Sequence, residues 1–353
     1  MHNRPSRSVL ACLLLAGFVL TACSGGTATS EVRGALTAIG SPIQSDPIGA
    51  WSNAWRKNNN ATSLNYSPDG AVVGLDALSS GEAYFAALDA PLTPEQQART
   101  TASCGPDGAF SVPVSITPIG VAFNMPSLRG LRLSRDVLAG IFSGEISRWD
   151  AEPIAVLNPD ATLPDAEIIP VLPTEPSAQV KAATTYLSKS GAWSAGISNT
   201  WNKTDTSKSV KKNREIADEV DQTAGSIAFM DLGYIGSRFD TALLDFGSGF
   251  VRLSKDSVAA AVQEGETRVS ETGVEYTLPE TSEHGYSLGV VSYQAYCSTY
   301  KNAQLASLVR SWGNFVVSPD GQVATTFFAS VASPSETALK ESRRRIETIK
   351  ESK

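Results

Sequence analysis

The stretch PVLPTEPSAQVKAATTYLSK, residues 170–189, has the pattern of an anion-binding turn. It predicts a strand that ends at Leu172, a tight connection, and a helix that begins near Ser177. Backbone N–H groups at the start of a helix have no partner within the helix, so they are free to bind an anion. The stretch holds three prolines and no glycine or arginine. Any binding here would therefore use the hydroxyl of Ser177 and the N–H groups of Ala178 and Gln179.

Catalytic chemistry has weaker support. His284 is the only histidine after residue 2, so neither a zinc site nor a Ser-His-Asp arrangement has a well-placed imidazole. We expect His284 to face solvent in a loop. Asp69 and Asp89 read as unrelated charges rather than an acid/base couple, and no Gly-Lys-Ser/Thr phosphate loop is present. We predict no enzyme activity, no catalytic residue, no metal and no cofactor.

Apolar runs alternate with helical patterns along most of the chain, which is typical of a mostly parallel sheet covered by helices. We expect strands near 32–40, 63–66, 83–88, 111–125, 168–172, 225–230 and 287–297. Helices are expected near 46–59, 72–81, 134–144, 177–189, 213–223, 303–317 and 335–350. The fold class is therefore α/β.

The first residues indicate export. Arg4 and Arg7 precede an apolar run from Val9 to Leu20 that is too short to span a bilayer as a mature helix. The run ends in Leu-Thr-Ala-Cys, the pattern of a bacterial lipobox. We expect a signal peptide over 1–22, a lipidated Cys23 and a flexible tether over 23–31. A plain secretory signal with an incidental cysteine is the alternative.

Charge and size narrow the function further. Without residues 1–22 the chain keeps 27 of its 29 Lys and Arg against 36 Asp and Glu, a net charge of −9. This excludes nucleic acid as the expected partner, because its binding depends on clustered basic residues. The remaining 331 residues suffice for two α/β lobes. We expect lobe one over 32–115 plus 290–353, lobe two over 116–289, and the ligand between them. One continuous doubly wound domain is the alternative.

Two cysteines remain after Cys12 leaves with the signal and Cys23 takes the lipid. In an oxidising compartment, a disulfide between Cys104 and Cys297 is the favoured interpretation. It would tie an early segment of lobe one to a late one. Two free buried thiols are the alternative.

Four motifs carry a resemblance to a known family. They are IFSGEISRWDAEPIAVLNPDATLPDAEIIPV at 141–171, LDAPLT at 88–93, YLSK at 186–189 and TAGSIAFMDLGYI at 223–235. In this order and spacing they resemble the phosphate-binding lipoproteins of bacterial phosphate ABC transporters, and the match extends over essentially the whole mature chain. The resemblance implies a type II periplasmic binding protein fold, in which two α/β lobes joined by two hinge strands enclose the ligand.

The family holds phosphate with backbone N–H groups, hydroxyls, one arginine and one aspartate. The aspartate accepts a hydrogen bond from a protonated phosphate oxygen, whereas sulfate offers no such proton. Carried over to this chain, the resemblance implies a ligand set of Ser41, Pro42, Ile43, Gly70, Ala71, Asp89, Ser177, Ala178 and Gln179.

The carried-over pocket departs from the family pattern. Pro42 stands where the family has threonine and donates no N–H, and Ala71 replaces a serine. Pro173 stands where the family has its arginine. With Asp89 kept and the arginine lost, a dianion would meet a carboxylate without a fixed cation, which is costly in a buried site. We therefore expect weaker phosphate binding, or a less charged ligand.

The resulting expectation is a monomeric solute-binding lipoprotein at the outer face of the cytoplasmic membrane, which delivers phosphate or a related oxyanion to ABC permease subunits. A surface-anchored accessory module that has lost high-affinity phosphate binding is the alternative.

Overall fold

A computed structural model describes residues 32–351. The expected signal peptide, the lipidated Cys23 and the tether lie outside the described residues, so these expectations remain predictions. Within residues 32–351, no helix is both long enough and apolar enough to cross a bilayer.

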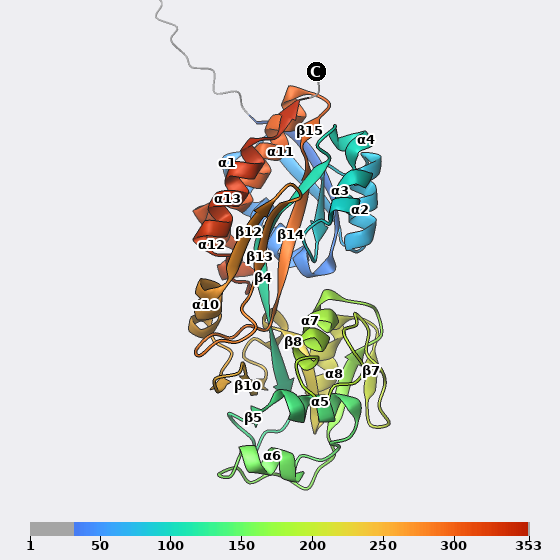
Figure 1. Ribbon diagram of the computed structural model, residues 1–353, viewed down its shortest axis with the longest axis vertical. Helices are drawn as coiled ribbons and strands as arrows, with labels where there is room; N and C mark the ends of the chain where they lie inside the picture. Colours follow the sequence, from blue (N-terminus) through green and yellow to red (C-terminus); the bar gives the residue numbers. More distant parts are fainter. Residues whose placement is uncertain (1–31, 352–353) are drawn as a thin grey trace, which may run out of the picture. The chain divides into compact units, whose positions relative to one another are not determined.

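The strands account for most of the expected apolar runs (Figure 1). Their bounds are β1 Gly34–Gly40, β2 Thr62–Ser67, β3 Phe85–Leu88, β4 Ala109–Phe123, β5 Arg132–Leu133, β6 Ile169–Pro173, β7 Lys208–Val210, β8 Ser226–Asp231, β9 Asp240–Thr241, β10 Leu243–Asp245, β11 Phe250–Val251, β12 Glu266–Ser270, β13 Gly273–Thr277, β14 Gly289–Cys297, β15 Thr299–Tyr300 and β16 Lys350–Glu351.

The helices follow the expected positions and add several that were not expected. They are α1 Ser45–Asn58, α2 Ala71–Ser80, α3 Pro94–Arg99, α4 Thr101–Cys104, α5 Arg135–Ser143, α6 Glu152–Leu157, α7 Ala178–Leu187, α8 Ile216–Gln222, α9 Leu232–Ile235, α10 Lys255–Glu264, α11 Ala303–Val316, α12 Pro319–Phe328 and α13 Glu336–Glu347, with 3-10 turns η1 at Pro42–Gln44 and η2 at Asn213–Glu215.

The main sheet of the described chain runs in the order β2-β1-β3-β14-β4-β8-β6-β7. β1 pairs in parallel with β2 and with β3. β6 likewise pairs in parallel with β7 and with β8. The expectation of a mostly parallel sheet is wrong at its centre, where β14 runs antiparallel to β3 and β4, and β4 antiparallel to β8. The physical reason is that β4 carries the chain out and β14 carries it back beside β4. The α/β class itself is confirmed.

The 15-residue strand β4 connects two apolar cores. The first core gathers buried side chains from residues 36–114 and 274–349. The second core gathers buried side chains from residues 119–290. Figure 1 shows two groups of helices. One group lies beside the strands of the first core and comprises α1, α11, α12 and α13; the other lies around β8 and comprises α5, α7 and α8. All residues of β4 are buried, so this strand contributes to both cores.

A disulfide joins Cys104, at the end of α4, to Cys297, at the end of β14. The favoured pairing is thereby confirmed. The bond spans 193 positions of sequence and lies within the first core.

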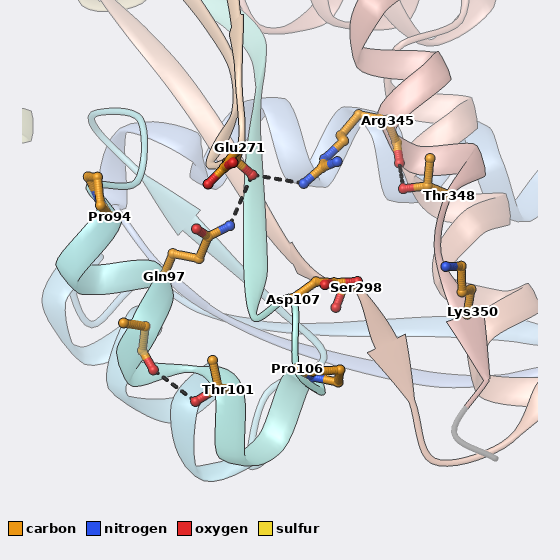
Figure 2. Close-up of a pocket in the computed structure, with 11 residues that line it drawn as sticks. Pro94, Gln97, Thr101, Pro106, Asp107, Glu271, Ser298, Arg345, Thr348 and Lys350 are labelled. Atoms are coloured by element: carbon orange, nitrogen blue, oxygen red, sulfur yellow. Dashed lines mark hydrogen bonds between the residues drawn. The ribbon is translucent and has the colours of Figure 1, made fainter.

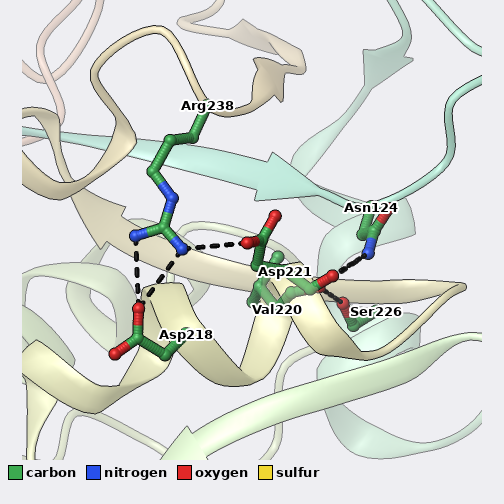
Figure 3. A network of polar contacts seen from close by, with 6 residues as sticks. All are labelled: Asn124, Asp218, Val220, Asp221, Ser226 and Arg238. Atoms are coloured by element: carbon green, nitrogen blue, oxygen red, sulfur yellow. Dashed lines mark hydrogen bonds and ion pairs between the residues drawn. The ribbon is translucent and has the colours of Figure 1, made fainter.

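Polar contacts fasten the far end of β4 to its neighbours (Figure 3). The amide of Asn124 donates to the carbonyls of Val220 and Asp221 at 2.8 and 3.0 Å. Arg238 reaches the carboxylates of Asp218 and Asp221 at 3.2 and 3.1 Å. These ion pairs are exposed and contribute little net stability, but together with the amide contacts they fix the end of α8 against β4.

Candidate functional site

Two parallel strands end side by side and bring Ser41 and Asp89 together. Gly40, the last residue of β1, pairs in register with Ala87 of β3. Ser41 follows β1 directly, and its N–H donates to the carbonyl oxygen of Ala87 at 2.9 Å. Its side chain is buried and lies close enough to the Asp89 carboxyl to lower the pKa of that group. The carbonyl of Ser41 accepts a 2.6 Å bond from the hydroxyl of Tyr66.

The Asp89 carboxylate keeps one oxygen free. Its Oδ1 atom is buried and has no hydrogen-bond partner among the described residues. Burial raises the pKa of this carboxyl, while the hydrogen bond from Ser41 and the positive charge of Lys181 act to lower it. An unpartnered buried acceptor is costly unless a ligand donates to it. Asp89 is therefore suited to accept a hydrogen bond from a ligand.

The turn η1 lies between the two cores and contacts both of them. The Gln44 amide donates to the carbonyls of Leu88 and Tyr293 at 2.9 and 3.0 Å. Ile43 packs against the second core, whereas Ala38 before it and Ile48 after it belong to the first. Pro42 is exposed and offers no N–H. This loop thus reaches from the strand ends toward the second core.

Gly70 and Ala71 lie beside the same loop. Gly70 has a φ of 106°, a conformation that side chains disfavour, and its N–H donates to the carbonyl of Gly40 at 2.8 Å. Helix α2 begins at Ala71, which packs on the first core. The next two residues, Val72 and Val73, are 74% and 47% exposed. The first turn of α2 is therefore apolar, and it begins at the position where the family pattern has a serine.

The opening turn of α7 has the expected geometry. Ser177 is the N-cap, and its Oγ accepts from the N–H of Val180 at 3.2 Å. Its own N–H donates to the carbonyl of Asn199 at 2.9 Å. Within the described residues, no acceptor takes the N–H groups of Ala178 or Gln179. These two donors, at the positive end of the helix dipole, are available to an anion.

Gln179 anchors the turn. Its side chain is buried and its amide nitrogen donates to the carbonyl of Phe229 at 2.9 Å, while its Oε1 atom has no partner in the described structure. Ala178 packs against the second core, as does Ile43 from the other loop. The two loops therefore meet the same core. The positive charge of Lys181 in α7 also acts on the Asp89 carboxyl, which directly follows β3.

Three neighbours of this arrangement were not in the sequence-based ligand set. Gln44 and Tyr66 orient the Ser41 loop, and Lys181 supplies a positive charge. Helical periodicity could have indicated Lys181, because it lies four residues after Ser177 and hence on the same side of α7. Nothing local in the sequence marks Tyr66, whose role depends on the pairing of β1 with β2.

A second buried carboxylate lies at the end of β8. Asp231 is 8% exposed, and its Oδ1 atom has no hydrogen-bond partner in the described part. Burial, and secondarily the negative charge of Asp46, raise its pKa to about 7. The group therefore titrates near neutral pH.

A separate hollow of about 670 Å³ lies between the helices α3 and α4 and the end of α13 (Figure 2). Arg345 there stacks over Phe110, 4.9 Å from the ring centre, and donates to the carbonyl of Glu271 at 2.8 Å. The Gln97 amide donates to the same carbonyl at 3.0 Å. None of its lining residues belongs to the Ser41 loop or to the opening turn of α7.

His284 is exposed, as expected.

Comparison with protein families gives a match over residues 25–320 to the model described as PBP superfamily domain. The phosphate-binding protein PstS 3 of Mycobacterium leprae is 27% identical over 307 residues, covering 84% of this chain and 82% of that protein. The phosphate-binding protein PstS of Methanocaldococcus jannaschii is 28% identical over 270 residues, covering 71% and 69%.

Solved structures share the fold. A high-affinity periplasmic phosphate-binding protein, PfluDING, bound with phosphate, superposes with a TM-score of 0.69 at 15% identity, covering 88% of this chain and 93% of that one. The phosphate-binding protein of Stenotrophomonas maltophilia gives 0.66 at 16% identity, covering 88% and 94%. The expected type II periplasmic binding protein fold is confirmed.

Proposed function

Because this chain belongs to the PBP superfamily, we propose that it is a non-enzymatic, extracytoplasmic binding protein for phosphate or a closely related tetrahedral oxyanion. It would hold the anion between two lobes and deliver it to the permease of an ABC importer. The names of the relatives, which are phosphate-binding proteins, support this proposal.

The observation that carries the proposal is the Asp89 carboxylate. One of its oxygens is buried without a partner. The free N–H groups at the start of α7 belong to a segment that packs on the same core as Ile43 of the neighbouring Ser41 loop. A carboxylate that accepts and backbone N–H groups that donate suit an oxyanion that still carries a proton. Sulfate carries no proton at neutral pH and would be repelled by Asp89.

The proposed ligand set is Ser41, Pro42, Ile43, Gly70, Ala71, Asp89, Ser177, Ala178 and Gln179. Ser41 and Ser177 would contribute hydroxyls, and Ala178 and Gln179 would contribute N–H groups. Pro42 and Ile43 would contribute shape, because the former has no N–H and the latter is packed on the second core.

We further propose two lobes with the hinge in β4 and β14, near residues 115 and 290. Along β4 the buried side chains change from the first core to the second between residues 114 and 119. Along β14 they change back between residues 290 and 293, which supports this boundary. The hairpin of β12 and β13 would join lobe one, because Gly273 pairs with Ser111 and Val274 lies in the first core. Attachment through Cys23 to the outer face of the cytoplasmic membrane, as a monomer, completes the proposal.

Titration calorimetry of the purified protein with inorganic phosphate and with sulfate tests this function. We expect phosphate to bind and sulfate to bind at least about tenfold more weakly, a difference of about 1.4 kcal/mol. Replacement of the acceptor in Asp89→Asn should weaken phosphate binding and narrow the preference over sulfate. Absence of phosphate binding to the unaltered protein would contradict the proposal.

A second candidate function is an accessory module with no transported ligand. The observation that favours it is the first turn of α2, where Val72 and Val73 are exposed beside a loop that has lost a serine and an N–H donor. This reading predicts no binding of either anion in the same titration, together with an unaltered fold by circular dichroism.

A further inference from the structure

Lys181 lies in the first turn of α7. It is the fourth helical residue, and its N–H donates to the carbonyl of Ser177 at 3.1 Å. Residues four apart lie on the same side of a helix, and helical side chains lean toward the N-terminus. The Lys181 side chain therefore leans back over the turn whose N–H groups are free.

The ammonium group of Lys181 is also uncommitted. It is exposed, and no hydrogen bond or ion pair engages its Nζ atom within residues 32–351. Three other lysines of the same half do have partners: Lys189 lies 2.6 Å from Glu280, Lys208 lies 2.9 Å from Glu219, and Lys211 lies 3.8 Å from Glu175. Lys181 is thus an unpaired positive charge that is available to a ligand.

Asp89 lies within electrostatic range of this charge. The positive charge of Lys181 acts to lower the pKa of this carboxyl, although burial raises it overall, and the described residues show no direct ion pair between the two groups. The carboxylate keeps one oxygen free, and the ammonium keeps its three donors. Because the two groups do not pair with each other, each remains available to a ligand.

We propose that Lys181 is the cation of the anion site, taking over the task of the arginine that Pro173 displaces. The inference rests on the proposed function and specifies its ligand class: a tetrahedral oxyanion that carries at least one proton, with the proton directed at Asp89 and the charged oxygens toward Lys181 and the α7 N–H groups. Lysine and aspartate cancel in net charge, so a proton-bearing oxyanion avoids the unopposed repulsion that Asp89 alone would impose.

An ammonium is a compact point charge, whereas a guanidinium grips two oxygens at once in a fixed plane. Lys181 should therefore contribute attraction with less directional grip. Phosphate affinity in this protein is expected to depend on ionic strength, because an exposed ammonium is screened by salt.

The test is calorimetric titration of inorganic phosphate into the purified protein and two matched variants, Lys181→Gln and Lys189→Gln. Both remove one positive charge near the same helix, but Lys189 lies beyond its end and pairs with Glu280. We expect Lys181→Gln to weaken phosphate binding on the order of tenfold or more, and Lys189→Gln to leave it within about twofold. Thermal unfolding without phosphate verifies that each variant is folded.

The outcomes distinguish the role of Lys181 from the proposed function as a phosphate-binding protein. Equal affinity of the unaltered protein and Lys181→Gln would overturn the role of Lys181 and leave the proposed function standing. Equal losses in both variants would show a general charge effect and also overturn it. No phosphate binding by the unaltered protein would overturn the function and this inference together. Rescue by Lys181→Arg, together with a salt dependence that Lys181→Gln lacks, would support it.

Discussion

At the scale of single residues, Asp231 shows how burial creates a titrating group. Its carboxylate is 8% exposed, and one oxygen lacks a partner in the described chain. Water would stabilise the charged form, so loss of water favours the proton, and the nearby charge of Asp46 adds to this. The pKa of about 7 lies well above the ordinary 3.8.

This shift makes stability depend on pH. Below about pH 4 the group is protonated in both the folded and the unfolded chain, so it has no effect. As the pH rises, the unfolded chain loses the proton first, and the free energy of unfolding falls until about pH 7. A shift of about three units corresponds to at most about 4 kcal/mol.

The variant Asp231→Asn should remove this penalty. We expect it to unfold at a higher temperature than the unaltered protein at pH 8, and the difference to shrink toward zero near pH 4. Thermal unfolding followed by circular dichroism across this range measures it. Asp160→Asn is the control, because Asp160 is exposed. A stability difference for Asp231→Asn that does not change with pH would contradict the argument.

At the scale of elements, two helices offer a matched pair of N-caps. Ser177 caps α7 and Ser134 caps α5, and each Oγ accepts from the N–H three residues later at 3.2 Å. Ser177→Ala and Ser134→Ala should each cost about 1 kcal/mol of stability. Only Ser177→Ala should also weaken phosphate binding, since its hydroxyl belongs to the proposed site. Urea unfolding and calorimetry together provide both readouts, and an equal affinity loss in the two variants would remove Ser177 from the ligand set.

The packing of α2 on β1 depends on a glycine. A Cβ atom at Gly74 would lie 2.3 Å from the carbonyl oxygen of Ile39 and 2.8 Å from the Cα atom of Gly40. Both are backbone atoms that cannot move aside without displacing the Ser41 loop. Gly74→Ala should therefore destabilise the protein by about 1–3 kcal/mol, as overpacking does.

Gly49 of α1 provides the control for this prediction. A Cβ atom there meets nothing within 4 Å. Gly49→Ala should stabilise the protein by about 0.5–1 kcal/mol, because alanine loses less freedom on entering a helix. Urea unfolding compares the two variants, and a stabilising effect of Gly74→Ala would show that α2 can shift.

The elements that sequence reasoning missed are those whose signal is not local. The strand β12, with sequence ETRVS, is almost entirely exposed, so it has no apolar face to reveal it. The helix α12 begins at a proline and contains a glycine in its first turn. The buried strands β4 and β14 were expected, since long apolar runs persist in the sequence. Their antiparallel pairing was not, because direction is a property of the path between strands.

The candidate site divides in the same way. Asp89 and Ser177 were identified through motifs and through the N-cap pattern, both of which are local. Lys181 and Tyr66 were missed, because the role of each depends on a residue distant in sequence: Asp89 for Lys181 and Ser41 for Tyr66. The periodicity of α7 places Lys181 on the same side of the helix as Ser177, but the sequence does not show that its charge acts on Asp89, which follows β3.

At the scale of the whole molecule, the disulfide links two segments that are far apart in the sequence. Cys104 and Cys297 are 193 residues apart, and nearly all of the second core lies between them. The double variant Cys104→Ala/Cys297→Ala should lose about 2–5 kcal/mol, the usual cost of removing a native disulfide. Urea unfolding with and without reductant measures this loss. The unaltered protein should become less stable in reductant, and the double variant should not respond to it.

The pair Asp46 and Asp231 links an early helix, α1, with a strand from the middle of the chain, β8. Asp46 belongs to α1, which packs on the first core, and Asp231 ends β8, which lies in the second half of the molecule. The charge of Asp46 helps to raise the pKa of Asp231. Asp46→Asn should therefore stabilise the protein at pH 8, where Asp231 is ionised, and should do so less at pH 5, where Asp231 holds its proton.

A double-mutant cycle isolates this coupling. If the two carboxylates repel each other, Asp46→Asn stabilises the unaltered protein at pH 8 but has little effect in the Asp231→Asn background, where no partner charge remains. Because Asp46 is exposed, solvent screens the interaction and the coupling should shrink further in high salt. Urea unfolding of the four proteins at pH 5 and pH 8 gives the cycle. An equal effect of Asp46→Asn in both backgrounds would place its action elsewhere, for example at the start of α1.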